Sequence, residues 1–378
     1  MIKKRTGLDL DPTFTASKLK WLTHCRGDIA DGLSKGDLLF GTVDTWLIWK
    51  LTGGTSYVTE PGNASRTMLF DIDRVGWDAE LAAIFSLNIA SLPDCRPSNS
   101  RFGETDSSLF GAPILITAVM GDQQAALFGH GCFDELEAKI TYGTGAFLWV
   151  NAGSHRREAP GEGIIRTIAW QIDRPCYAYE GFIMYAGKIL EWMAARLALH
   201  DGLAGVAAAA EQAKTSAGVL LVPAYQGLAS PWWQPALRAA LIGLGETTSN
   251  GHIAHAGLEA VCYQIRAVLD TIERRRGRAV PLIKIDGGMT RSRYFMELQA
   301  SVLKRQLSLA PYDAMTPFGA ALMAGLGSGV WRSLDELKHI ASTAARIDPD
   351  ATAAPLLDEN YRRWLRMIET LIKAEAKP

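Results

Sequence analysis

The sequence predicts an α/β protein, and three observations lead to that fold class. Stretches typical of strands and stretches typical of helices alternate from residue 113 onward, which favours a sheet that is at least partly parallel. The chain has 378 residues, a length that favours two domains and leaves a third open. Its hydrophobic content of 48% and charged content of 21% are ordinary for a globular protein with a full core.

Short helices and loops make up the section before about residue 112. Apolar side chains recur at helical spacing in residues 17–25, 44–53 and 77–87. Gly53 and Gly54 end the second of these helices, because glycine readily adopts the left-handed conformation found at helix termini. Extended segments are predicted at residues 55–60 and 64–72.

The character of the chain changes at Pro113. Residues 113–119, PILITAV, form a continuous apolar run, which predicts a strand that is buried on both faces. Further extended stretches are predicted at residues 138–153, 164–171, 177–181, 218–224 and 282–288. Helices are predicted at residues 184–199, 252–275, 318–331 and 360–374. We expect a domain boundary near residues 129–132.

Charge and cysteine usage exclude several classes of function. The formal net charge is −1, so no overall field attracts nucleic acid or an anionic membrane. The five cysteines form no CxxC pair and no zinc spacing, which argues against a disulfide framework or a metal held by the protein. The N-terminus lacks the apolar core of a signal peptide, and no apolar run reaches membrane-spanning length. We therefore expect a cytoplasmic protein with a small ligand.

Asp122, in the stretch MGDQQAALFG, is the first candidate for chemistry. It follows the predicted strand at residues 113–119 and precedes a run of small residues that predicts a helix. Ligands of open α/β sheets lie at the carboxyl ends of strands, where a carboxylate could accept a proton from a hydroxyl that attacks phosphorus. A plain helix cap accounts for the acid almost equally well, and both interpretations stay open.

Two glycine-rich turns are candidates for phosphate binding. Thr141–Phe147, TYGTGAF, lies between two extended stretches, and its exposed N–H groups could hold phosphate oxygens. Ile285–Arg293, IDGGMTRSR, leads from a strand through two glycines to a predicted helix start, which can hold an anion. A hairpin turn without a ligand explains the first stretch equally simply. Neither stretch matches the Rossmann or P-loop fingerprint.

Seven stretches together resemble the glycerol kinases of the FGGY carbohydrate-kinase family, in the same order along the chain. They are residues 40–54, 58–72, 121–129, 139–147, 222–233, 285–289 and 318–331. The resemblance implies an actin-like (ribonuclease H-like) α/β ATPase fold, with two domains and a cleft between them. It implies that residues 1–130 are the C-terminal part of the substrate domain and residues 131–378 the nucleotide domain.

The same resemblance implies the reaction and its ligands. ATP, with Mg²⁺ on its phosphates, would phosphorylate glycerol to glycerol 3-phosphate. The partners implied are the polyol and ATP, without nucleic acid or membrane, and a homo-oligomer stays open. Asp122 would be the catalytic base, Gln123 would hold the polyol, and Phe147 would pack against its carbon chain.

Nucleotide contacts are also implied by the resemblance. Thr144 would contact the ATP phosphates, Gly187 the ribose–phosphate side, and Gly288 the adenosine. Ser292 stands where an asparagine usually contacts adenine, and Glu191 replaces a glutamine near the nucleotide.

The resemblance begins at Thr6, and the family's first quarter has no counterpart in this sequence. That quarter carries a DxGT phosphate loop and an Arg-Glu pair on glycerol, so we expect an incomplete first domain with exposed apolar surface. Thr13 stands where these kinases have a tyrosine on the substrate. Two alternatives therefore stay open: a catalytically inactive remnant, and a kinase for another polyol or sugar.

Overall fold

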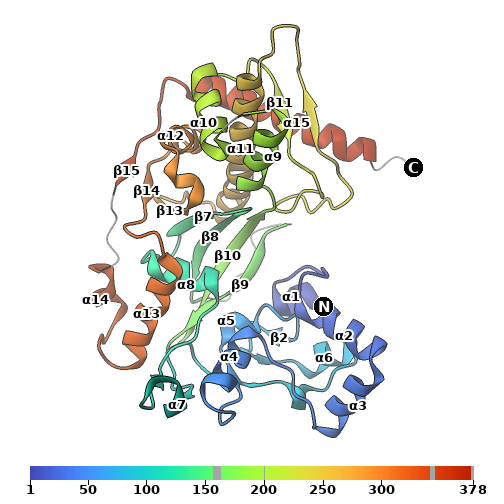
Figure 1. The fold of residues 1–378 in the computed structure, drawn as a ribbon, viewed down its shortest axis with the longest axis vertical. Helices are drawn as coiled ribbons and strands as arrows, with labels where there is room; N and C mark the ends of the chain where they lie inside the picture. Colours follow the sequence, from blue (N-terminus) through green and yellow to red (C-terminus); the bar gives the residue numbers. More distant parts are fainter. Residues whose placement is uncertain (156–162, 200, 341–344, 376–378) are drawn as a thin grey trace.

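A seven-stranded sheet organises the larger part of the computed structural model, which describes residues 1–155, 163–199, 201–340 and 345–375. We call residues 1–121 the N-terminal lobe and residues 122–375 the C-terminal lobe. Figure 1 shows the sheet between the helices of the C-terminal lobe and the N-terminal lobe.

The strand order of this sheet is β15-β14-β13-β7-β8-β10-β9. The bounds are β7 Ala138–Tyr142, β8 Ala146–Gly153, β9 Ile165–Gln171, β10 Pro175–Ile183, β13 Ile283–Gly287, β14 Leu307–Leu309 and β15 Arg346–Ile347. β13 runs parallel to β7 and β14, and the other neighbours are antiparallel. The predicted partly parallel sheet is therefore confirmed, as are the extended stretches between residues 138 and 181.

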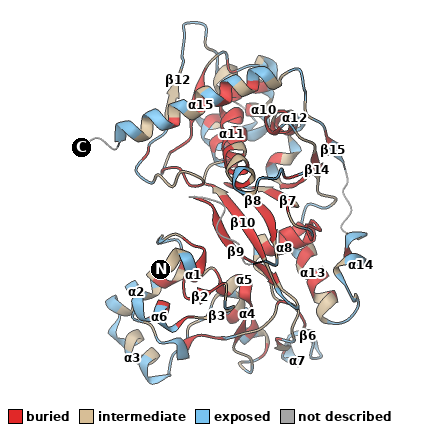
Figure 2. Cartoon of the chain, turned by 180° about the vertical axis from the view of Figure 1, so that it is seen from behind, coloured by how far each residue is buried: buried red, intermediate tan, exposed pale blue. Residues whose placement is uncertain are grey.

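Helices cover both faces of the sheet, as Figures 1 and 2 show. One face carries α8 (Asp122–Gly129) and α13 (Met315–Gly327), whose apolar side chains form one core cluster with Trp149 and Trp170 of the sheet. The other face packs Ile140 and Leu148 into the largest core cluster, together with α11 (Asn250–Arg276). Burial on both faces explains why these strands have few exposed side chains.

The remaining elements of the C-terminal lobe surround this centre. They are α9 Gly187–Arg196, α10 Gly202–Ala213, η2 Gly288–Arg291, α12 Arg293–Leu303, α14 Leu334–Lys338, α15 Ala354–Glu375, and the paired strands β11 Leu220–Val222 and β12 Ala240–Ile242. The predicted helices of this part are confirmed by α9, α11, α13 and α15. Among the described residues no helix has both the length and the apolar character needed to cross a membrane.

The N-terminal lobe has only short strands among its described residues. Its helices are α1 Ile2–Thr6, α2 Thr15–Cys25, α3 Gly27–Lys35, α4 Val43–Leu51, α5 Pro61–Ala64, α6 Ala79–Ile84, η1 Ile89–Ser91 and α7 Ser107–Phe110. Its strands pair two by two: β1 Val58–Thr59 with β4 Asp94–Cys95, β2 Phe70–Asp71 with β3 Gly76–Trp77, and β5 Gly103–Glu104 with β6 Leu115–Ile116. The three predicted helices are confirmed, and Gly53 and Gly54 after α4 have φ of 62° and 83°.

The strand predicted at residues 113–119 is wrong in length and burial. Only Leu115 and Ile116 form a strand, and they pair with the two residues of β5 alone. Ile114 is 51% exposed, so the run is not covered on both faces. An apolar run needs neighbouring strands and covering helices to be buried, and here the described chain supplies only the two-residue strand β5 on one side. The extended prediction for residues 64–72 is also wrong in its first half, because Ala64 ends α5 and turns follow it.

Exposed apolar side chains gather on the N-terminal lobe. Trp46 of α4 is 59% exposed, and Val43 and Leu47 on the same helix are more than half exposed. Phe110 at the end of α7 is exposed as well. This matches the expectation of uncovered apolar surface in the first domain.

Candidate active site

One face of the central sheet carries an unusual set of polar side chains. Residues paired across neighbouring strands point to the same face, and the register pairs Thr141 with Phe147 on β8 and with Asp286 on β13. Lys139, two residues before Thr141, shares that face. Its ammonium group contacts Gln123 of α8, so this is the face that α8 covers.

Asp122 is the first helical residue of α8. Gly121 occupies the N-cap position, and the Asp122 carboxylate accepts the N–H of Gln123 at 2.8 Å. Thr316, near the start of α13, donates its hydroxyl to the Asp122 carbonyl oxygen at 3.3 Å. The acid is exposed and lies at the positive end of the helix dipole. The sequence placed it at the end of a buried strand; that part of the interpretation is wrong, because the preceding strand is short and exposed.

Lys139 lies beneath Asp122 and was missed as a site residue. Its ammonium donates to Gln123 Oε1, and to Thr141 Oγ1 at 2.8 Å. The side chain is fully buried, and burial lowers the pKa of Lys139 to about 8, although the charges of Asp286 and Asp122 partly oppose that shift. The sequence signal was the alternation of Lys139 and Thr141 with Ile140 and Tyr142 just before the glycine hairpin.

The hairpin between β7 and β8 meets the start of α9. The carbonyl of Thr144 accepts the N–H groups of Ala186 at 2.9 Å and Lys188 at 3.1 Å, and Gly187 donates to the Gly143 carbonyl at 3.0 Å. A Cβ at Gly187 would lie 2.7 Å from that carbonyl oxygen, so this close approach needs glycine. The structure therefore brings Thr144 and Gly187, two of the predicted nucleotide residues, together.

The second glycine turn lies beside this hairpin. β13 is parallel to β7, so the carboxyl ends of both strands are at the same edge of the sheet. Gly287, with φ of 99°, pairs with Tyr142, and a Cβ there would lie 2.2 Å from the Tyr142 carbonyl oxygen. Gly288 is exposed with open space at its Cβ position, and Ser292 caps α12 by accepting the N–H of Phe295 at 3.2 Å.

Glu191 lies on α9, one turn after Gly187. Its carboxylate is exposed and forms an ion pair with Lys188 at 2.8 Å. The predicted nucleotide residues thus lie on the loops and helix starts that follow β7, β10 and β13. Such positions present backbone N–H groups to an anion.

Thr13 and Phe147 line a common cavity of about 550 Å³ between the lobes. Phe147 stacks on Phe182 with ring centroids 4.7 Å apart, and Arg66 of the N-terminal lobe pairs with Glu180 of β10 at 2.6 Å. Asp122 and Gln123 are not among the described residues that line this cavity. The structure therefore joins the predicted substrate residues in two groups: Thr13 with Phe147, and Asp122 with Gln123.

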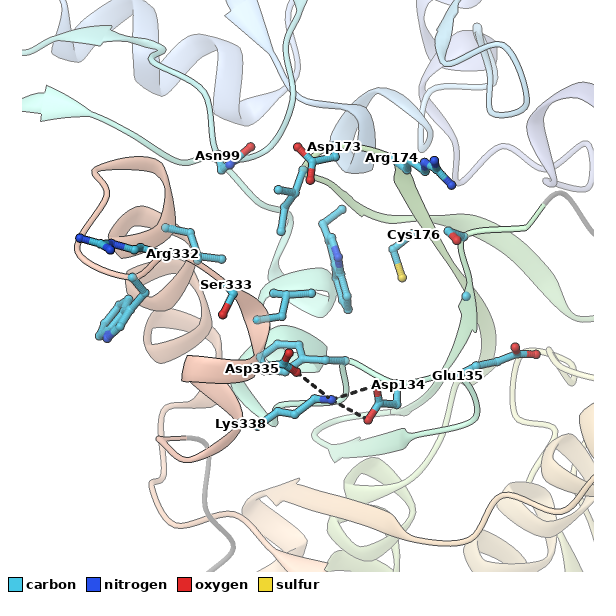
Figure 3. Close-up of a pocket in the computed structure, with 18 of the residues that line it drawn as sticks. Asn99, Asp134, Glu135, Asp173, Arg174, Cys176, Arg332, Ser333, Asp335 and Lys338 are labelled. Carbon is cyan, nitrogen blue, oxygen red and sulfur yellow. Dashed lines mark hydrogen bonds and ion pairs between the residues drawn. The ribbon is translucent and has the colours of Figure 1, made fainter.

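A second cavity, of about 800 Å³, contains none of the predicted site residues among its described lining. It lies between the end of α13, α14 and the β9–β10 connection. Figure 3 shows the Lys338 ammonium there between Asp134 at 2.9 Å and Asp335 at 3.3 Å. Because that cation is already paired, the cavity is a weaker candidate than the sheet edge.

Comparison with known proteins gives matches over almost the whole chain. Residues 1–129 match the N-terminal domain, and residues 138–328 the C-terminal domain, of the FGGY family of carbohydrate kinases. A glycerol kinase from Francisella philomiragia is 38% identical over 377 residues, covering 97% of this chain and 74% of the relative. A glycerol kinase from Bacillus anthracis is 38% identical over 371 residues, covering 98% and 74%.

Solved structures agree with these matches. The glycerol kinase of Plasmodium falciparum, solved with ADP, has a TM-score of 0.89 at 33% identity, covering 97% of this chain and 74% of that chain. A xylulose kinase from Lactobacillus acidophilus has a TM-score of 0.88 at 17% identity, covering 98% and 75%, and is similar in fold alone. The expected two-domain, actin-like α/β fold is confirmed by these likenesses.

Proposed function

The chain belongs to the FGGY family of carbohydrate kinases, and from that premise we propose that it phosphorylates glycerol to glycerol 3-phosphate with ATP. The observation that carries the proposal is the position of Asp122. It starts α8 above the polar sheet face that leads through Thr141 to the glycine hairpin. A carboxylate and a phosphate-binding turn on one face are the two parts that phosphoryl transfer requires.

Asp122 accepts the proton of the attacking hydroxyl in this proposal. The polyol oxygen then bonds to the γ-phosphorus, the bond from that phosphorus to the bridging oxygen breaks, and ADP leaves. Gln123 holds the polyol, and Phe147 and Thr13 bound its carbon chain from the cavity between the lobes. A positioned base typically contributes about 10²- to 10⁴-fold in rate.

The nucleotide is held by the C-terminal lobe in this proposal. Thr144 contacts its phosphates, Gly187 its ribose–phosphate side, and Gly288 its adenosine. Ser292 lies near the adenine, and Glu191 lies near the nucleotide. Support comes from the hydrogen bonds that join the hairpin segment of Thr144 to the helix start at Gly187, and from the open space at Gly288. Residues 131–378 are accordingly the nucleotide domain, and residues 1–130 belong to the substrate domain.

Mg²⁺ accompanies ATP in the proposed reaction. No group of three or more His, Cys, Asp or Glu that could hold a metal ion occurs among the described residues. Mg²⁺ usually keeps several waters and binds through one or two carboxylates together with substrate phosphates, so an ion carried by ATP fits this donor set. When bound, it neutralises charge on the β- and γ-phosphates.

Substitution of Asp122 tests the proposal. We expect Asp122→Asn to lower kcat for glycerol phosphorylation at least 10²-fold in a coupled ADP-release assay, because the amide cannot accept the proton. ADP binding, measured by calorimetry, changes little. Asp134→Asn, an exposed acid beside Lys338 in the second cavity, is the matched control and keeps full activity. Full turnover in Asp122→Asn would remove Asp122 from the role of base.

A different polyol or sugar is the second candidate for the substrate. Thr13 is short and exposed, and the cavity that it shares with Phe147 offers about 550 Å³. The same assay with glycerol, four- and five-carbon polyols and pentoses compares kcat/KM across the set. The highest kcat/KM for glycerol supports the first proposal, and a higher value for a longer polyol supports the second.

A further inference from the structure

Lys139 is a buried charge that interacts electrostatically with the proposed base, Asp122. It is fully buried on β7, and its ammonium reaches up to α8, where it contacts Gln123 Oε1. Its second partner is Thr141 Oγ1 at 2.8 Å, on the strand that runs into the glycine hairpin. One cation therefore joins the helix that carries Asp122 to the strand that carries the phosphate turn.

We propose that Lys139 is a positioning residue for the polyol site, because it fixes the orientation of the Gln123 side-chain amide. The inference rests on the proposed kinase function and deepens it. In this proposal the buried lysine determines the direction in which Gln123 points its N–H groups. Lys139 does not touch the substrate and acts only through Gln123.

Lys139 determines the orientation of the Gln123 amide because an ammonium group can only donate hydrogen bonds. An amide side chain can turn by 180° and exchange its oxygen with its nitrogen at little cost in shape. An ammonium group has three donors and no acceptor, so it tolerates only the amide oxygen. With Oε1 of Gln123 held by Lys139, Nε2 is the atom that lies 3.4 Å from the Asp122 carboxylate. The amide N–H groups are then directed toward the place where a hydroxyl meets the base.

Several charged groups face Lys139 from the elements packed around it. Asp286 approaches from β13, Asp122 from α8 and Glu180 from β10, and these acids favour the charged lysine. His130, at the end of α8, lies 3.5 Å from Asp286. Its pKa is lowered, chiefly by burial, so it adds no competing positive charge near neutral pH. The ammonium is therefore balanced by acids on three sides.

A second buried lysine on the neighbouring strand has a different task. Lys284 pairs with Lys139 in the register, but its ammonium donates to the carbonyl oxygens of His130 at 2.7 Å and Gly131 at 3.2 Å. It therefore stabilises the C-terminal end of α8, while Lys139 contacts the N-terminal end. Lys284 supplies a matched control, because it is also a lysine on the same face and is 9% exposed, but it does not contact Gln123.

The experiment combines single and double variants of the full chain. Lys139→Met keeps the length of the side chain and removes its charge, and we expect kcat/KM for glycerol to fall about ten- to a hundredfold. The change lies mainly in KM for the polyol, while KM for ATP moves less than about threefold. In the Gln123→Ala background, the same substitution costs less than about threefold, because the group that Lys139 orients is gone.

The pH profile gives a readout that a merely structural lysine would not move. With the pKa of Lys139 near 8, kcat/KM for glycerol declines above about pH 8 in the wild type. Lys139→Met lacks this decline, and Lys284→Met keeps both the decline and the wild-type polyol KM although it lowers the melting temperature. Lys139→Arg, where it folds, retains the low KM and shifts the decline to higher pH.

Three results would overturn the assignment, and they are distinguishable from one another. An active wild type whose Lys139→Met variant keeps the polyol KM and the decline above pH 8 contradicts the role of Lys139 alone. Equal losses from Lys139→Met with and without Gln123 contradict it as well. A wild-type chain that neither binds nor phosphorylates any polyol overturns the proposed function, and the assignment with it.

Discussion

Similar apolar stretches are buried in the C-terminal lobe and exposed in the N-terminal lobe. Residues 138–153 lie in the middle of a seven-stranded sheet with helices on both faces, whereas residues 113–119 yield two paired residues and exposed side chains. In Figure 2 the strands β8 and β10 are mainly buried, whereas α2 and α3 of the N-terminal lobe are mainly exposed or half-buried. Composition alone does not make a stretch a buried strand; neighbouring strands and covering helices do.

The contrast extends to the proposed chemistry. Most of the proposed site residues lie in the C-terminal lobe, on loops and helix starts that a well-packed sheet supports. The N-terminal lobe contributes Thr13 from an exposed segment. We therefore expect Thr13, on the N-terminal side of the polyol cavity, to be held less rigidly than the site residues of the C-terminal lobe.

The largest expected effect is in the C-terminal core. Trp364 of α15 is fully buried and donates its indole N–H to the Leu221 carbonyl at 2.8 Å. We expect Trp364→Ala to lower the free energy of unfolding by about 3–5 kcal/mol, from lost contacts and a cavity. Urea denaturation followed by circular dichroism measures it. A decrease below about 1 kcal/mol would contradict the comparison, because the C-terminal lobe would then not be stabilised by its buried core.

An intermediate effect is expected where α8 crosses α13. A Cβ at Gly319 would lie 1.8 Å from the Ala125 carbonyl oxygen and 2.7 Å from the Gly129 nitrogen. Gly319→Ala therefore forces the two helices apart, at about 1–3 kcal/mol, and displaces Asp122 at the start of α8. We expect both the melting temperature and kcat to fall. The control is Ala321→Gly, on the exposed side of α13, which we expect to cost about 0.5–1 kcal/mol and to leave kcat unchanged.

The smallest effect is expected on the exposed face of the N-terminal lobe. Trp46→Ser removes a large side chain that is 59% exposed, and we expect the free energy of unfolding to change by less than about 0.5 kcal/mol. Trp364→Ala and Trp46→Ser thus compare the loss of a buried and of an exposed tryptophan in the two lobes. A decrease of more than about 2 kcal/mol in the free energy of unfolding would show that the Trp46 side chain is not exposed in solution.

The sequence predicted those elements whose pattern is local. The 27-residue helix α11 and the strands on either side of the glycine hairpin carry their own periodicity, and both are as expected. The strand predicted at residues 113–119 failed because burial depends on partners that no local pattern reveals. The same dependence explains why the buried strand predicted before Asp122 is absent from the structure of the described residues.

The proposed site divides in the same way. Thr144 and Gly187 lie 43 positions apart, and the resemblance to the family predicts both as nucleotide residues; hydrogen bonds join their segments in the structure. Lys139 was missed because a lysine in a strand normally predicts an exposed face. Only the register, which places Asp286 beside Thr141 and α8 above them, shows that its ammonium is buried.

Phosphorus NMR of the reaction mixture tests the central claim most directly. The purified chain is incubated with ATP, Mg²⁺ and glycerol, and the resonances are followed over time. We expect a phosphomonoester resonance of glycerol 3-phosphate to grow in step with ADP. Intact ATP, or ATP converted to ADP and inorganic phosphate without that ester, would contradict the account.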